Sequence, residues 1–125
     1  MAFDALDPVH VVEHWQARAW GDFDLTAVDE LIADPLLRHG PSGTVERSHE
    51  ELKDDLRQYR RTLCKPTITV NDRVVQGGCV WSRVTMRGHN IESGEPHAVE
   101  WLQVHRVVDG RIVELWSLYA SGVIW

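Results

Sequence analysis

The first third of the chain repeats its apolar residues at the spacing of an α-helix. The first helix is expected to begin at Asp7-Pro8, an N-cap followed by proline at the first helical position, and to end at Gly21. Its apolar stripe consists of Val12, Trp15 and Ala19. Asp24 is placed to cap a second short helix over 25–32. Asp34-Pro35 should end that helix, because the residue before proline avoids the α region.

A third helix is marked by a capping box, in which Ser48 and Glu51 stand three residues apart. The residues before it predict a short extended segment over 36–39 and a Gly- and Pro-rich loop over 39–43. Pro66 closes the helical pattern. The apolar stripe of this helix is Leu52, Leu56, Tyr59 and Leu63.

The second half of the chain alternates β-branched and polar residues, which is typical of strands. Asp109-Gly110 is the strongest short hairpin signal in the sequence. Helices followed by an antiparallel meander indicate the α+β class. The strands are predicted over 67–75, 79–87, 97–108 and 111–119.

Length and composition predict one soluble domain over residues 1–125. A net charge of −6 argues against a nucleic-acid or anionic-membrane surface. No basic segment followed by an apolar run opens the chain, so a cytoplasmic protein is expected. Cys64 and Cys79 are expected to be buried or half-buried free thiols. Neither cysteine has ligand spacing with histidine, and we expect no metal and no cofactor.

The strand predicted over 97–108 is apolar on both faces. Trp101, Gln103 and His105 share one face, because side chains alternate along a strand. That face is expected to hold the helices and a pocket. Leu102 and Val104 lie on the other face, which we expect to meet a second copy of the chain in a homodimer through the outer sheet face.

Four strings of the sequence, in order, resemble the SnoaL-like family of the nuclear transport factor 2-like superfamily, the polyketide cyclase and steroid isomerase-like fold. They are Trp20–Leu25, Ala33–Pro41, Val84–His89 and the hairpin string Arg106–Trp116. The resemblance implies a cone-shaped, strongly bent antiparallel sheet wrapped around three N-terminal helices. It also implies an internal pocket that works without a cofactor. This fold hosts several unrelated reactions as well as inert binders.

Gln103 and His105 match a Gln-x-His pair that lines the active site of SnoaL-like cyclases. An imidazole can take a proton from a carbon next to a carbonyl, and an amide can donate a hydrogen bond to the resulting enolate oxygen. The alternative is a half-buried pair that hydrogen-bonds to neighbouring backbone.

The cyclases also use an aspartate on the last strand, and the resemblance places Ala120 at that position. Its neighbour Tyr119 is a possible hydrogen-bond donor, although a phenol with a pKa near ~10 is a poor base. His105 or His39 would then have to act as the base. The alternative for His39 is a loop residue in solvent.

The candidate substrate-binding residues are Trp15, Tyr59, Trp101 and Trp116. The first three could form the aromatic walls of the pocket, although such residues are more often simple core packing. Glu100 and Glu114 are expected on the outer face or at the sheet edge, in surface pairs.

The favoured function is a small-molecule enzyme that uses general acid/base catalysis for isomerisation, dehydration or cyclisation of an apolar polycyclic or aromatic substrate. The alternatives are a non-catalytic binding domain on the same fold, which Ala120 favours, and a structural dimerisation module whose pocket is filled by side chains.

Overall fold

The structure is a computed structural model that describes residues 7–122. The helical segments all lie in the first half of the sequence, and two strands separate the last helix from the others. Together with four later strands, these two strands form a six-stranded sheet. The helices are α1 (Pro8–Trp15), its π-helical continuation η2 (Gln16–Gly21), α2 (Thr26–Leu31) and α3 (His49–Thr62). The strands are β1 (Ile32–Gly40), β2 (Gly43–Arg47), β3 (Leu63–Gln76), β4 (Cys79–Asn90), β5 (Pro96–Val108) and β6 (Arg111–Ser121).

The predicted caps at Asp7 and Ser48 are confirmed, whereas the N-cap of α2 is Leu25, one residue after the predicted Asp24, and Leu25 makes no side-chain capping bond. Asp7 caps α1, since its Oδ1 accepts from the Val9 N–H at 3.0 Å. At α3 the Ser48 hydroxyl accepts from the Glu51 N–H at 3.1 Å, and the Glu51 carboxylate accepts from the Ser48 N–H at 3.0 Å. These bonds satisfy amide groups that a helix start leaves without partners, and they fix where each helix begins.

The sheet has the order β2-β1-β6-β5-β4-β3. The meander from β3 to β6 is antiparallel as predicted, but β1 pairs with β6 in parallel, so the sheet is mixed rather than purely antiparallel. The chain forms the strand β2 over Gly43–Arg47, between the loop predicted over 39–43 and the third helix, where the sequence predicted no strand. Gly43 has a φ of 113°, a conformation open to glycine, and it lets the chain turn back on β1.

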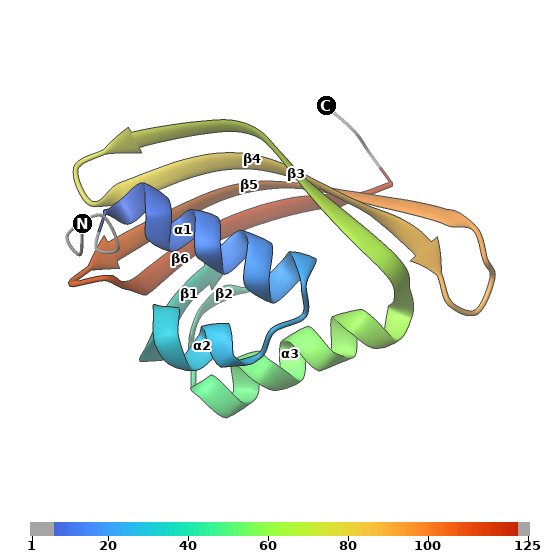
Figure 1. The fold of residues 1–125 in the computed structure, drawn as a ribbon, viewed down its shortest axis with the longest axis horizontal. Coiled ribbons are helices and arrows are strands. Elements are labelled where there is room, and N and C mark those ends of the chain that lie inside the picture. Colours follow the sequence, from blue (N-terminus) through green and yellow to red (C-terminus); the bar gives the residue numbers. More distant parts are fainter. Residues whose placement is uncertain (1–6, 123–125) are drawn as a thin grey trace.

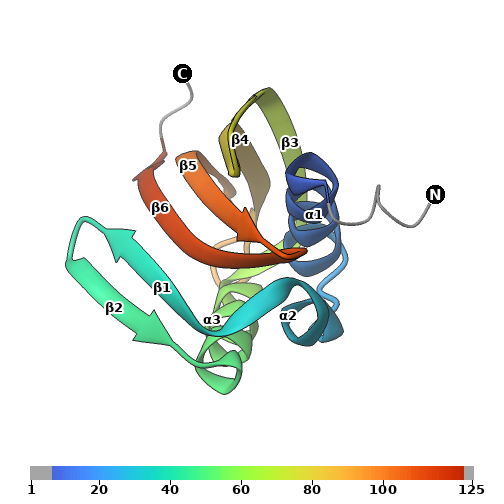
Figure 2. The ribbon, with the colours of Figure 1, turned by 90° about the vertical axis from the view of Figure 1, so that its left-hand side faces the viewer.

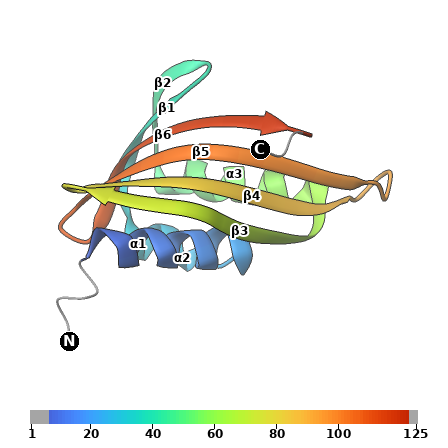
Figure 3. The same ribbon diagram turned by 90° about the horizontal axis from the view of Figure 1, so that it is seen from above.

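The sheet bends around the helices, which all lie on its concave face (Figures 1 and 2). Seen from above, β3 to β6 form a curved layer over α1 to α3 (Figure 3). The main core cluster joins α1 and α2 to the sheet and includes Val12, Val28 and Ile112, all buried. A second cluster lies between the start of β3 and the middle of β5, around Met86 and Trp101. The expected α+β cone fold is confirmed.

Cys64 is exposed and Cys79 is half-buried, and both are free thiols. The expectation that both would be at least half-buried is wrong for Cys64, which lies where β3 leaves α3. No helix within residues 7–122 is long and apolar enough to cross a bilayer.

Replacing Ser48 by alanine should lower the free energy of unfolding by about 1 kcal/mol, because the N–H groups of the first turn of α3 lose their acceptor. Urea denaturation followed by circular dichroism measures the change. Ser42→Ala, in the exposed turn between β1 and β2, is the matched control. Equal stabilities of the two variants would contradict a stabilising role for the capping box.

Candidate active site

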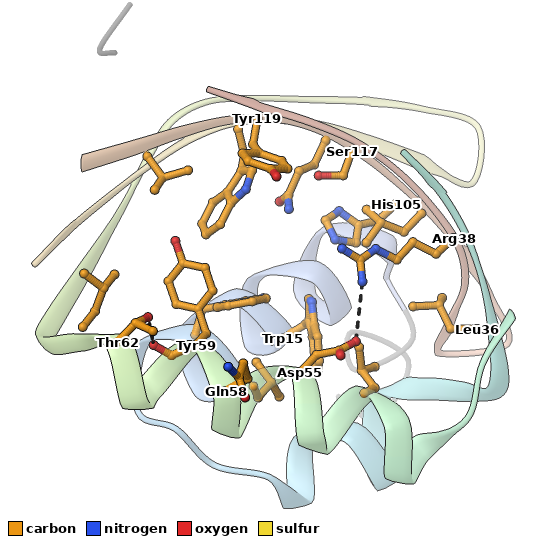
Figure 4. A pocket seen from close by; sticks show the side chains of 18 of the residues that line it. Trp15, Leu36, Arg38, Asp55, Gln58, Tyr59, Thr62, His105, Ser117 and Tyr119 are labelled. Carbon is orange, nitrogen blue, oxygen red and sulfur yellow. Dashed lines mark hydrogen bonds and ion pairs between the residues drawn. The ribbon is translucent and has the colours of Figure 1, made fainter. Parts of the chain in front are cut away.

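A cavity of about 560 Å³ lies between α3, η2 and the inner face of the sheet (Figure 4). This volume is in the range of small-molecule sites. A pocket filled by side chains, which the alternative of a structural dimerisation module required, is therefore not found. The aromatic lining of the cavity is Trp15, Trp20, Tyr59, Trp101 and Tyr119, and its polar lining includes Arg38, Asp55, Gln103, His105 and Ser117.

Three rings form one end of the cavity. The ring centroids of Trp20 lie 5.4 Å from those of both Tyr59 and Trp101, and the Trp20–Tyr59 contact is edge-on. Aromatic edges and faces in this arrangement attract one another and hold the wall in shape. The sequence analysis missed Trp20, because it lies in the π-helical segment η2, whose wider turns break the α-helical spacing from Trp15.

The strand register brings the polar groups together. Gln103 lies opposite Ser117 of β6 and His105 lies opposite Leu115, so their side chains share the inner face with Trp101. The predicted common face of these β5 residues is confirmed. Tyr119 lies opposite Trp101 at the mouth of the cavity, where it is 60% exposed.

His105 is enclosed, with only 1% of its surface exposed. Neither ring nitrogen has a hydrogen-bond partner among the described residues. Burial, and next the charge of Arg73, lower the pKa of His105 from 6.5 to about 3. The imidazole is therefore neutral at physiological pH, and both of its buried nitrogens lack a partner within the described part of the chain.

Arg38 and Asp55 are a charged pair in the cavity wall that the sequence analysis missed. Arg38 Nη1 lies 3.5 Å from Asp55 Oδ2. The Arg38 guanidinium extends toward Asp55, and Arg38 and His105 both line the cavity (Figure 4). Arg47 holds the same carboxylate with two hydrogen bonds of 2.7 and 3.1 Å. The sequence could have placed Arg38 in the cavity through its spacing from Leu36. Leu36 is a buried apolar residue two positions earlier on β1, and residues two apart on a strand point to the same face.

Tyr59 carries a phenol that stays protonated. Burial, followed by the proximity of Tyr119, raises the pKa of Tyr59 to about 12. Its hydroxyl is therefore a hydrogen-bond donor and not a base at neutral pH.

The expected placement of His39 and Trp116 in the pocket is wrong. Their rings stack on one another, with centroids 5.0 Å apart, and neither residue lines the cavity. His39 Nε2 lies 2.6 Å from the Glu114 carboxylate and Nδ1 lies 2.8 Å from the Thr44 hydroxyl. The physical reason is the parallel pairing of β1 with β6. It sets Arg38 on the inner face and His39, one residue later, on the outer face beside Trp116.

Glu114 lies on the outer face as expected, but it is nearly buried. The hydrogen bond from His39, and next that from Arg106, lower its pKa below the ordinary value of 4.5. Glu100 is also fully buried rather than in a surface pair, and its carboxylate accepts from the Thr85 hydroxyl.

Ala120 lies opposite Glu100, on the outer side of β6. The β6 residues that line the cavity are Ser117, Tyr119 and Ser121. Ala120 therefore does not face the pocket, and it no longer favours a binding domain over an enzyme.

The fold and the cavity define a SnoaL-like protein. The profile of the SnoaL-like domain matches residues 12–115, and the chain belongs to this family. No curated protein matches the sequence. Among solved structures, IdmH from Streptomyces antibioticus, described as a candidate polyketide cyclase, is 29% identical. The alignment covers 92% of this chain and 91% of IdmH, with a TM-score of 0.78.

Two further structures share the fold. A SnoaL-like protein from Jannaschia sp. CCS1 is 17% identical over 93% of this chain and 85% of its own, with a TM-score of 0.78. TsrD from Streptomyces laurentii is 23% identical over 90% of this chain and 85% of its own, with a TM-score of 0.74.

The low pKa of His105 makes the stability of the protein depend on pH with a defined sign. Between pH 6.5 and 3 the unfolded chain binds a proton at this residue and the folded chain does not, so stability falls as the pH falls. When the pH is lowered from 7 to 4.5, the wild type should lose about 2 kcal/mol of its free energy of unfolding more than His105→Gln, which cannot be protonated at this position.

Urea denaturation of both proteins at the two pH values measures this difference. His14→Gln, on the exposed side of α1, is the control and should track the wild type. A stability difference between His105→Gln and the wild type that does not change with pH would contradict a neutral His105.

Proposed function

We propose that this chain is an enzyme that transfers protons on an apolar polycyclic or aromatic small molecule, by isomerisation, dehydration or cyclisation. The observation that carries the proposal is a neutral imidazole without a hydrogen-bond partner among the described residues, in an aromatic-walled cavity that Arg38 also lines. Buried polar groups are normally hydrogen-bonded, so an unpaired one calls for an explanation, and a catalytic role is one. The general base in this proposal is His105.

The reaction begins at a C–H bond next to a carbonyl group of the substrate. His105 takes the proton through a ring nitrogen, and the electron pair of that bond moves onto the carbonyl oxygen to give an enolate. The Gln103 amide and the Arg38 guanidinium donate hydrogen bonds to this oxygen, and Tyr119 donates from the mouth of the cavity. Returning the proton to another atom completes an isomerisation.

The low basicity of His105 belongs to the ligand-free protein. Burial and the positive charge of Arg73 disfavour its charged form. Proton transfer creates the imidazolium and the enolate together, and their attraction in a water-poor cavity offsets part of the cost of charging the ring. Each pKa unit recovered in this way is about 1.4 kcal/mol.

Similarity to IdmH, described as a candidate polyketide cyclase, supports a substrate with several rings. The second candidate function is a non-catalytic binding domain. It is favoured by one observation: Asp55, the only carboxylate that lines the cavity among the described residues, is held by two arginines and is not free to act as a base.

Deuterium exchange into 2-tetralone, a bicyclic ketone with acidic C–H groups next to its carbonyl, separates the two candidates. We expect the wild type to accelerate exchange in D2O, followed by proton NMR. His105→Ala and His105→Gln should slow the catalysed exchange by about 10²-fold or more, because the base is removed. His14→Ala is the surface control.

A binding domain gives a different pattern. 2-Tetralone would then change the tryptophan fluorescence of the protein without any accelerated exchange. Exchange that is unaffected in a folded His105→Gln variant would refute the assignment of the base.

We also propose that the chain forms a homodimer through the outer face of the sheet. The register aligns apolar side chains there, with Trp81 opposite Val104 and Leu102 opposite Leu118. Trp81, Leu102 and Leu118 are 53%, 46% and 57% exposed in the single chain. A contiguous apolar patch of this kind marks an interaction surface.

Leu118→Lys should convert the dimer into a folded monomer, because a charge would have to be buried at the centre of this face. Sedimentation velocity gives the mass, and circular dichroism reports folding. Val45→Lys, exposed on β2, is the control and should leave the dimer intact. A monomeric wild type at micromolar concentration would disprove the dimer.

A further inference from the structure

We propose that the substrate carries a carboxylate, which Arg38 binds inside the cavity while the aromatic body of the substrate lies against Trp20, Tyr59 and Trp101. The inference rests on the proposed function and names the chemical class of its substrate. Arg38 is the only arginine or lysine among the described residues that line the cavity. The same cavity is lined by the His105 imidazole, and the Arg38 guanidinium extends toward Asp55 (Figure 4).

Arg38 is held in place by one ionic contact. Its Nη1 lies 3.5 Å from the Asp55 carboxylate. The same carboxylate is bound by Nε and Nη2 of Arg47, at 3.1 and 2.7 Å, and Arg47 does not line the cavity. Arg47 also pairs with Glu51 at 3.3 Å, so Asp55 is shared by two guanidinium groups while Arg47 has a second carboxylate. The side chain of Arg38 is 43% exposed, which leaves the N–H groups that it does not direct at Asp55 open to a ligand, and Asp55 acts as the positioning residue for Arg38.

The rest of the cavity suits an anion at this place. The polar lining of the cavity also includes His105, which is neutral, and the uncharged residues Gln103 and Ser117. An incoming carboxylate meets no like charge there except the Arg47-bound Asp55. Arginine binds a carboxylate through two parallel N–H groups, and such a pair is strengthened where water is excluded.

The aromatic wall and Arg38 come from different elements, so the cavity has two chemically distinct ends. Trp20 and Tyr59 lie on η2 and α3, whereas Arg38 lies on β1. A purely apolar substrate would leave the guanidinium desolvated without a partner beyond Asp55, at a cost in binding free energy. An aromatic acid satisfies both ends at once.

The test compares 2-naphthoate with 2-naphthamide, a neutral probe of nearly the same shape, by isothermal titration calorimetry. We expect the wild type to bind the naphthoate at least about 10-fold more tightly than the amide, because a hydrogen bond to a charged group contributes about 1.5–3 kcal/mol. Raising the salt concentration should weaken only the naphthoate complex.

Arg38→Gln should abolish this discrimination, and circular dichroism shows that the variant is folded. Arg38→Lys should restore part of the discrimination, because it keeps the charge without the fork. Arg57→Gln, an exposed change on α3 where Arg57 pairs with Asp54, is the control and should behave as the wild type.

Two failures are distinguishable. Equal binding of the two probes, or discrimination that persists in Arg38→Gln, overturns the carboxylate inference and leaves the apolar pocket of the proposed function standing. Absence of binding of either probe to the wild type at millimolar concentration, together with no exchange of 2-tetralone, overturns the proposed function and the inference with it.

Discussion

The structure depends on the register of the four long strands, because a strand presents alternate side chains to opposite faces. That register sets a row of polar residues across the concave face and an apolar row one residue away on the convex face. A shift of one position would move His105 out of the cavity and Val104 into it. The polar row consists of Arg73, Ser82, Gln103 and Ser117, and the apolar row of Val74, Trp81, Val104 and Trp116.

Two basic side chains that line the cavity differ in their surroundings. His105 is fully enclosed, and burial and the charge of Arg73 favour its neutral form. Arg38 is partly exposed and pairs with Asp55. Arg73 in turn is bound by Glu13 and by Gln16 of the α1–η2 segment. The helices therefore help to set the protonation state of the sheet face that they cover.

Local patterns in the sequence predicted what short-range physics decides. The capping box at Ser48, the cap at Asp7 and the alternation of Trp101, Gln103 and His105 all depend on neighbours within a few residues. The errors concern pairings over long distances along the chain. His39 could be assigned to a face only by knowing that β1 pairs with β6, 75 residues away from it at Glu114. Trp20 was missed because a π-helical segment does not follow α-helical spacing.

The orientation of Ala120 changes how catalysis in this chain is judged. An alanine at that position counted against an enzyme only while it was thought to face the pocket, and it faces Glu100 on the other side. The carboxylate that does line the cavity, Asp55, is committed to Arg47 and Arg38. In the proposed mechanism, proton transfer therefore depends on His105. Whether the cavity catalyses or only binds is decided by how far a negative charge formed on the substrate, held by Arg38 and Gln103, can stabilise the imidazolium against its burial.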